Sequence, residues 1–261
     1  PTGAHHPVVR PFSQTPRPMR AFETEPKQST PVAAQQPRVG QGTDARLSLR
    51  LVTLLELASV IGSVLLTVWA VVPLYPQSRW AMALPALLAL ALILHSQSVR
   101  GESWRELGFS ATHAGAALRL LSVPVLLSCG ALLAFGYFSQ ALHRSTHFEI
   151  NLLVVPLWGV VQQYVLQAFI YRRVRALVLN ASWAAWLTAA LFAFVHLPNV
   201  TLTVLTFLAA ALWSWVYERA PNLWVLGLSH GLLSLVVMHS LPAWLLQSMS
   251  VGYKHFLYQK F

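Results

Sequence analysis

The segment 160-VVQQYVLQAFIYRRVR-175 decides how this sequence folds, because it places amide side chains inside an apolar run of helical length. It extends the apolar run that follows Asn151, and three arginines close it. An apolar stretch of about 20 residues is typical of a membrane-spanning helix. Gln163 and Gln167 are one helical turn apart and share a face. Because an unpaired amide in lipid is costly, we expect this face to point toward other helices or a water-filled cavity.

The composition indicates a membrane protein along most of the chain. Of 261 residues, 56% are hydrophobic and 10% are charged, and the mean hydropathy is positive. These values favour a polytopic membrane protein over a soluble enzyme. The net charge is +10, but beyond the N-terminal region the basic residues flank apolar segments. We therefore expect membrane lipids as partners and no nucleic acid. The single Cys129 excludes an intramolecular disulfide and a multi-cysteine metal site.

Residues 1 to 49 differ in composition from the rest of the chain. They hold eight of the sixteen prolines and no long apolar run. Such a segment cannot bury enough apolar surface to fold, so we predict a disordered, Pro-rich basic tail. His5 and His6 in this tail supply too few ligands for a metal site. The remaining residues, 50–261, are predicted to form the membrane domain.

The membrane domain contains a series of apolar segments separated by short polar connections. We predict an all-α, polytopic membrane helix bundle of about seven (six to eight) transmembrane helices. The tail 242–261 is expected to lie at the membrane interface, with a short eighth span as the alternative. The expected spans are 51–74, 80–95, 118–138, the run from 152 into the quoted segment, 184–197, 200–217 and 223–238.

The arginines of the connections favour one orientation. Most of them fall on a single side if the N-terminus is cytoplasmic, as the positive-inside rule requires. We therefore expect an integral protein of a bacterial inner membrane with a cytoplasmic N-terminus. The three arginines that end the quoted segment are interpreted first as topology and head-group anchors, and second as contacts for a substrate carboxylate. The inner set is Arg46, Arg50, Arg100, Arg105, Arg172, Arg173, Arg175 and Arg219, and the outer set is Arg79 and Arg144.

Polar residues of the second half of the chain fall at similar depths. Measured from Arg172 along the helices, Gln162 and Gln163 lie at about 15 Å, His196 at about 18 Å and His230 at about 11 Å. Any one of them is explained equally well by interhelical hydrogen bonding. The set is harder to explain in that way, because each imidazole has two nitrogens to satisfy in lipid. We therefore predict a site between the fourth, fifth and seventh helices.

Two stretches around these histidines carry a resemblance. The sequence 191-LFAFVHLPN-199 contains Phe192-x-x-x-His196. The sequence 211-ALWSWVYERAPNLWVLGLSHGLLS-234 contains Tyr-Glu-Arg, then Asn-Leu-Trp, and then His230. In this order, after a glutamine pair, they resemble the CAAX-protease and bacteriocin-processing family of intramembrane proteases, also called the Abi family. The resemblance covers about residues 150 to 240.

The resemblance implies a water-mediated endopeptidase that acts on a peptide or protein substrate at the membrane. It implies a glutamate that activates water and histidines that stabilise the oxyanion. The family is often classed with metalloproteases, so the resemblance also allows a divalent metal such as zinc at the histidines. The family's motif positions fall here on Gln162 and Gln163 for its Glu pair, Gln167 for its Arg, His196, His230, and Ser234 for its final Asn or Asp.

These replacements leave three alternatives. An amide has no useful basicity near neutral pH, and two histidines fall short of the three protein ligands usual for catalytic zinc. Either a histidine is the base and Gln162 or Gln163 positions water or substrate, or a carboxylate from elsewhere enters the site. The third alternative is a non-catalytic relative, of scaffold or immunity type, that binds peptides. Glu56 is the one acid clearly placed inside an apolar segment, so it is the candidate replacement acid; an interhelical pairing with His, Ser or Arg explains it as well.

Two polar residues near the connections have structural explanations beside functional ones. Asn199, after Pro198, is expected to cap the following helix, and its amide is a candidate for binding an oxyanion. Glu218 is expected to form a turn-fixing ion pair with Arg219. A transporter would also carry inward polar groups, but no inverted repeat supports it. The sequence thus favours an intramembrane endopeptidase, with a non-catalytic peptide-binding protein as the alternative.

Overall fold

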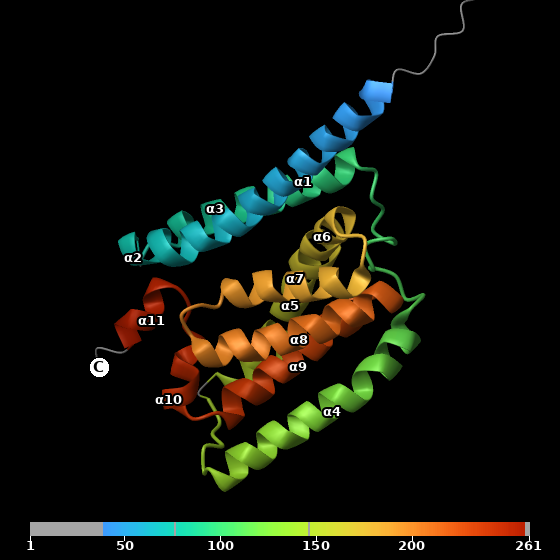
Figure 1. Ribbon diagram of the computed structural model, residues 1–261. Helices are drawn as coiled ribbons and strands as arrows, with labels where there is room; N and C mark the ends of the chain where they lie inside the picture. Colours follow the sequence, from blue (N-terminus) through green and yellow to red (C-terminus); the bar gives the residue numbers. More distant parts are fainter. Residues whose placement is uncertain (1–38, 76, 146, 259–261) are drawn as a thin grey trace, which may run out of the picture. The chain divides into compact units, whose positions relative to one another are not determined.

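The computed structural model describes residues 39–75, 77–145 and 147–258, and helices are the regular secondary structure there (Figure 1). Gly40–Phe261 form one compact unit; the other, Pro1–Val39, lies outside the described residues except for Val39. The elements are α1 (Val39–Leu66), η1 (Thr67–Val71), α2 (Val72–Leu74), α3 (Arg79–Val99), α4 (Ala114–Phe138), α5 (Phe148–Gln163), η2 (Tyr164–Tyr171), α6 (Arg172–Leu177), α7 (Ala181–Phe194), α8 (Val200–Arg219), α9 (Leu223–Ser240), α10 (Ala243–Leu246), η3 (Gln247–Met249) and α11 (Tyr253–Tyr258).

The predicted all-α membrane bundle is confirmed. Within the described residues, five helical segments are long and apolar enough to cross a membrane, and two shorter apolar helices complete the seven predicted segments. The number of helices that cross the bilayer stays a prediction. The five long segments are Leu47–Leu74, Ala114–Phe138, Phe148–Leu177, Val200–Arg219 and Leu223–Ser240, and the two shorter ones are Ala83–Val99 and Ala181–Phe194.

The structure differs from the sequence prediction at the start of α1, at the end of α7 and at the C-terminal end. Helix α1 begins at Val39, so residues 39–49, expected to belong to the tail, are helical; residues 1–38, including His5 and His6, lie outside the described residues. Helix α7 ends at Phe194, so His196 follows the helix instead of lying inside it. Helical backbone is disfavoured at Leu197, the residue before Pro198, so this segment does not continue as a helix into α8. The short helices α10 and α11, of four and six residues, provide no eighth span.

Asparagine side chains fix the starts of three core helices. Asn180, Asn199 and Asn222 lie in extended backbone just before α7, α8 and α9. Each side-chain oxygen accepts a hydrogen bond from the backbone N–H three residues further on. These bonds satisfy N–H groups that a helix start otherwise leaves unpaired. The predicted cap at Asn199 is thereby confirmed.

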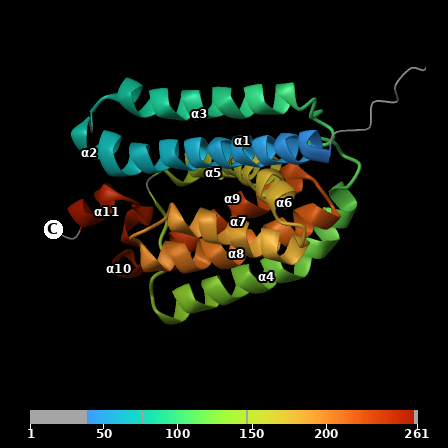
Figure 2. The same cartoon turned by 45° about the horizontal axis from the view of Figure 1, so that its top comes forward.

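Helices α5 and α9 approach so closely that only glycine fits between them. A Cβ atom added at Gly231 would lie 2.3 Å from Pro156 Cα, and one added at Gly227 would lie 2.5 Å from Val160 Cα. Small residues one turn apart allow such an approach in membrane bundles. In two views α7 also runs beside α8, and α1 runs beside α3 (Figure 1, Figure 2). The α5–α9 contact is the one that brings the quoted glutamine segment to His230.

Candidate active site

The glutamines lie where an α-helix widens into a π-helix. Helix α5 passes into η2 after Gln163, and Gln167 lies within η2. Gln97 of α3 inserts beside this segment: its Nε2 donates to Ala168 O (3.1 Å), and Tyr164 OH donates to its Oε1 (2.6 Å). Single π turns within α-helices are frequent at functional sites. The widened turn leaves both glutamines completely buried.

Gln163 bonds directly to His230. The distance from Gln163 Nε2 to His230 Nδ1 is 3.3 Å. An amide nitrogen only donates, so His230 Nδ1 is the acceptor and its proton is on Nε2. The ring also stacks on Trp213, with centroids 4.3 Å apart and an interplanar angle of 27°. Trp213 is itself held by a bond from Nε1 to Ser229 Oγ (3.1 Å). The orientation and tautomer of His230 are therefore fixed by its neighbours.

His196 has the opposite tautomer. Its Nδ1 lies 2.7 Å from Phe192 O, and because a carbonyl only accepts, the proton is on Nδ1. Its Nε2 then carries a lone pair. Both imidazoles pack against the Phe192 ring, with centroid distances of 4.7 Å for His196 and 6.1 Å for His230. The site thus presents a basic nitrogen on His196 and an N–H donor on His230.

The other glutamines differ in their surroundings. Gln167 is fully buried, and neither its amide oxygen nor its amide nitrogen has a hydrogen-bond partner within the described residues. Gln163 Oε1 is likewise unpaired. Gln162 is half-buried and bonds to neither histidine within the described part of the chain. Of the predicted pair, Gln163 is the residue that reaches the imidazole of His230.

Ser234 and Asn199 differ in their burial and in their hydrogen bonds. Ser234 is half-buried on α9, one turn beyond His230. Asn199 uses both amide hydrogens, donating from Nδ2 to Leu246 O (3.0 Å) and to Ser250 O (3.2 Å). It therefore has no donor left for an oxyanion, and its predicted role in oxyanion binding is not supported by this geometry.

Glu56, the candidate replacement acid, is engaged by one serine and two arginines. Glu56 Oε1 accepts a hydrogen bond from Ser96 Oγ (2.8 Å). Its Oε2 is paired with Arg100 (2.7 Å) and Arg173 (3.1 Å). Arg173 lies ten residues after Gln163, which is about 15 Å along a helix. Glu56 is thus an interhelical ion-pair partner, which is the structural alternative that the sequence also allowed.

Arg173 is a buried ion-pair residue and not the head-group anchor that was predicted. Its side chain is 2% exposed. It contacts Glu102 through NH1 (2.8 Å) and NH2 (3.1 Å), donates to Ser96 Oγ (2.9 Å), and its guanidinium lies over the Phe169 ring. Arg172 shares Glu102 (3.1 Å). Two carboxylates and several arginines therefore join α1, α3 and the connection after α3 to α6.

Two carboxylates outside the apolar core show how these charges interact. Burial would raise the pKa of Glu102, but the hydrogen bonds and charges of Arg173 and Arg172 outweigh burial, and the pKa is lowered. Glu218 pairs with Arg175 (3.1 Å) and accepts a bond from Tyr171 OH (2.7 Å). The predicted Glu218–Arg219 pair is therefore replaced by a pair between α8 and α6, and it ties the two helices together instead of fixing a turn.

The donor set does not fit the zinc that the resemblance allows. Within residues 39–75, 77–145 and 147–258, no group of three or more His, Cys, Asp or Glu side chains is placed to hold a metal ion. His230 also has Nδ1 engaged with Gln163, and His196 has Nδ1 engaged with Phe192 O. Two imidazoles fall short of the usual ligand number for catalytic zinc.

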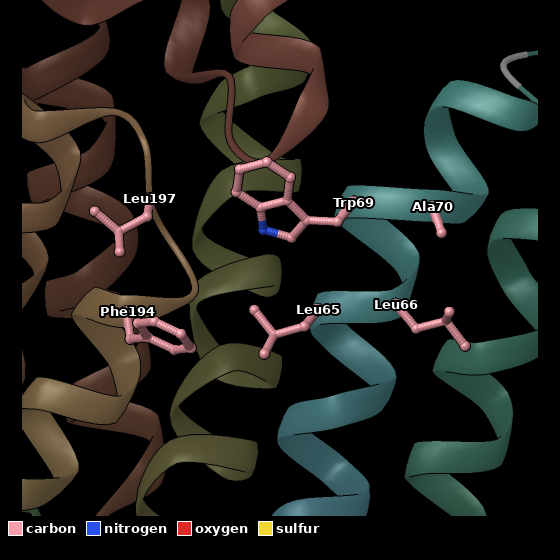
Figure 3. A pocket seen from close by; sticks show the side chains of 6 residues that line it. All are labelled: Leu65, Leu66, Trp69, Ala70, Phe194 and Leu197. Carbon is pink, nitrogen blue, oxygen red and sulfur yellow. The ribbon is translucent and has the colours of Figure 1, made fainter.

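An apolar cavity of about 510 Å³ borders the loop that carries His196. Its walls are Leu65, Leu66, Trp69 and Ala70 on one side and Phe194 and Leu197 on the other. Leu65 and Trp69 point toward Phe194 and Leu197 (Figure 3). The cavity therefore lies beside the loop of His196, and neither imidazole is among its lining residues.

Sequence reasoning missed three contributors to this site. Trp213 stacks on His230, and Gln97 supports the π-helix. The third is the glycine pair of α9, whose signal was present as 227-GLSHG-231, a spacing that marks close helix approach. That pattern encloses His230, so it could have indicated which helix face carries the site. No pattern in the sequence marks Trp213 or Gln97, because their roles depend on helix rotation.

A helical membrane bundle with a buried imidazole at His230, a half-buried one at His196 and buried amides defines a membrane protein with an internal polar site. Residues 144–236 match the family model described as Type II CAAX prenyl endopeptidase Rce1-like. This match contains Gln163, His196 and His230, and it supports the resemblance to the CAAX-protease family that the motifs carry. No curated protein and no solved structure matches the chain.

Proposed function

We propose that this protein is an intramembrane endopeptidase of CAAX type in which His196 takes the place of a glutamate as general base. The observation that carries the proposal is the bond from His196 Nδ1 to Phe192 O, because it leaves Nε2 as an acceptor for a proton of water. Imidazole is the side chain best matched to proton transfer near neutral pH. The match of residues 144–236 to the Rce1-like family model supports peptide hydrolysis as the reaction.

His230 has the complementary role in this proposal. Its Nε2–H donates to the oxyanion that forms when water attacks the peptide carbonyl. Gln163 keeps the proton on Nε2 by donating to Nδ1, and Trp213 holds the ring plane. Removing one oxyanion donor typically lowers turnover by about 10²- to 10³-fold. His196 would then return its proton to the leaving amine, which completes the hydrolysis.

A second function, peptide binding without cleavage, is favoured by Gln167. Its buried amide has one unpaired acceptor and unpaired donors. These match the N–H and C=O of one peptide group, which needs a donor and an acceptor side by side. A protein that has lost the acid pair of the family would retain this recognition. The scaffold or immunity-type alternative therefore rests on Gln167.

The proposed orientation has a cytoplasmic N-terminus in a bacterial inner membrane. It is supported by the mutual contacts of Arg100, Arg172 and Arg173, which gather at one end through Glu56 and Glu102. Positive residues concentrate on the cytoplasmic side of membrane proteins. Thiol labelling of single cysteines placed in the connections, in intact cells, tests the orientation.

The function is tested by cleavage of a quenched fluorescent peptide library by the full chain in nanodiscs. We expect cleavage by the natural chain, and a loss of about 10²-fold or more in His196→Ala and His230→Ala. His113→Ala is the matched control, because His113 is exposed in the connection before α4. Unchanged turnover in His196→Ala would overturn the proposal. Peptide binding without cleavage, weakened by Gln167→Leu, would support the second function instead.

A further inference from the structure

The C-terminal segment 243–256, here called the strap, lies against the loop that follows α7. Asn199 Nδ2 donates to Leu246 O (3.0 Å) and to Ser250 O (3.2 Å), both on the strap. The N–H of Gly252 donates to Leu197 O (2.9 Å). Within the loop, Asn199 N–H donates to His196 O (3.1 Å). The residues that follow His196 are thus bonded to the strap at two points.

The strap contains three consecutive residues with left-handed backbone, and the hydrogen bonds from Asn199 stabilise this turn. Gln247, Ser248 and Met249 have φ values of 48°, 52° and 55°. Such backbone is unfavourable for residues other than glycine and persists where surrounding contacts enforce it. The amide of Asn199 bonds the carbonyls on either side of the three residues, at Leu246 and Ser250. One side chain in the His196 loop therefore holds the strained turn in place.

Gly252 connects the strap to η1. Its φ is +58°, and a Cβ atom there would lie 2.5 Å from Val68 O. Phe256 packs on Trp69, with ring centroids 6.2 Å apart. Trp69 and Leu197 are opposite walls of the apolar cavity (Figure 3). The strap therefore contacts both sides of this cavity, next to the loop of His196.

We propose that the strap is the positioning element of His196. Within the part of the chain that the structure describes, the hydrogen bond of the His196 ring goes to its own helix end, at Phe192 O. The backbone after His196 therefore decides how Nε2 lies relative to His230. That backbone is fixed by two links to the strap, from the Asn199 side chain of the loop and from the N–H of Gly252 on the strap. Asn199 and Gly252 touch no reacting atom; they act through His196. The expected effect on turnover rests on the proposed function, whereas the effect on the loop does not.

Two substitutions test the strap, each with a control matched in chemistry. Gly252→Ala introduces a side chain at positive φ against Val68, and Gly101→Ala does so at φ +67° with nothing within 4 Å. Asn199→Ser keeps a helix-capping oxygen but loses both amide donors to the strap. Asn180→Ser is its control, because the Asn180 side chain caps α7 and makes no bond to the strap.

The readout is hydrogen exchange of the full chain in nanodiscs, followed over residues 193–199. We expect exchange there to become at least about tenfold faster in Gly252→Ala and Asn199→Ser, and to stay unchanged in both controls. Unchanged exchange in the two strap variants would overturn the inference. Exchange that rises equally over α3 and α4 would indicate loss of the fold instead of a loosened loop, and would also overturn it.

Turnover provides the second readout. With His196 displaced, we expect kcat to fall at least about tenfold while KM is unchanged, because transition-state and not ground-state contacts are lost. Equal losses in the strap variants and their controls would contradict the inference. If the natural chain cuts no peptide, the proposed function fails, and the exchange measurement still decides whether the strap holds the loop.

Discussion

The substitution Gly231→Ala tests whether the α5–α9 contact builds the site. The new Cβ would lie 2.3 Å from Pro156 Cα and 2.8 Å from Pro156 N, whereas ordinary contacts begin at 3.4 Å. The two helices must therefore separate locally by about 1 Å, because a packed interior has no free space. Overpacking of this kind costs about 1 to 3 kcal/mol. The Gln163–His230 bond, already 3.3 Å long, would pass beyond hydrogen-bonding distance.

Two assays measure the consequence of Gly231→Ala. The midpoint of thermal unfolding in nanodiscs should fall by about 2 to 4 °C for each kcal/mol lost. Turnover should fall by about 10²-fold, because a displacement of about 1 Å at a reacting centre has that effect. Gly130→Ala on α4 is the control, since a Cβ there has nothing within 4 Å. A Gly231→Ala protein that matches Gly130→Ala in both assays would refute the reasoning.

Three further predictions concern the buried polar groups. Arg173→Met should lower the free energy of unfolding by about 1 to 3 kcal/mol, because it leaves Glu56 with Arg100 alone and Glu102 with Arg172 alone. Arg175→Met should cost less than about 1 kcal/mol, because its pair with Glu218 is partly exposed. Equal shifts in thermal unfolding would contradict this. The lowered pKa of Glu102 means that its contribution is complete above its ordinary pKa of 4.5 and lost as pH falls through the lowered pKa. The difference in unfolding midpoint between the natural chain and Glu102→Gln should therefore shrink on acidification, and a constant difference would exclude this linkage. Gln167→Met should raise the free energy of unfolding by about 1 to 3 kcal/mol, because it removes an unpaired buried amide. The same variant should bind peptide more weakly or turn it over more slowly. A lower free energy of unfolding, measured by calorimetry, would count against an unpaired amide.

The sequence predicted the helical bundle and the meeting of its polar residues. Apolar runs marked the helices, and similar depths in the fourth and seventh spans anticipated the Gln163–His230 contact. The sequence could not show which of Gln162 and Gln163 faces His230. Adjacent residues differ by about 100° around a helix, and an almost wholly apolar segment has no polar face that fixes the rotation. The choice is made by the glycines of α9, which set how α5 packs.

The partners of the charged residues were less predictable. From the sequence, Glu56 could pair with any arginine at its end of the bundle. The structure pairs it with Arg100 and Arg173. Long arginine side chains reach several acids from one backbone position, so their pairing depends on tertiary packing. The strap is a different case, because Leu197, Leu246 and Ser250 contribute backbone carbonyls, which every residue has. No residue type in the sequence marks such a contact.

The central claim is that the natural glutamine form cuts peptides with a histidine base. It is tested most directly by comparing peptide cleavage by the natural chain with cleavage by a Gln162→Glu/Gln163→Glu double variant, both in nanodiscs. We predict that the natural chain cuts, and that His196→Ala abolishes this cleavage. Cleavage by the double variant alone would contradict the claim, and would assign the natural chain to peptide binding without hydrolysis.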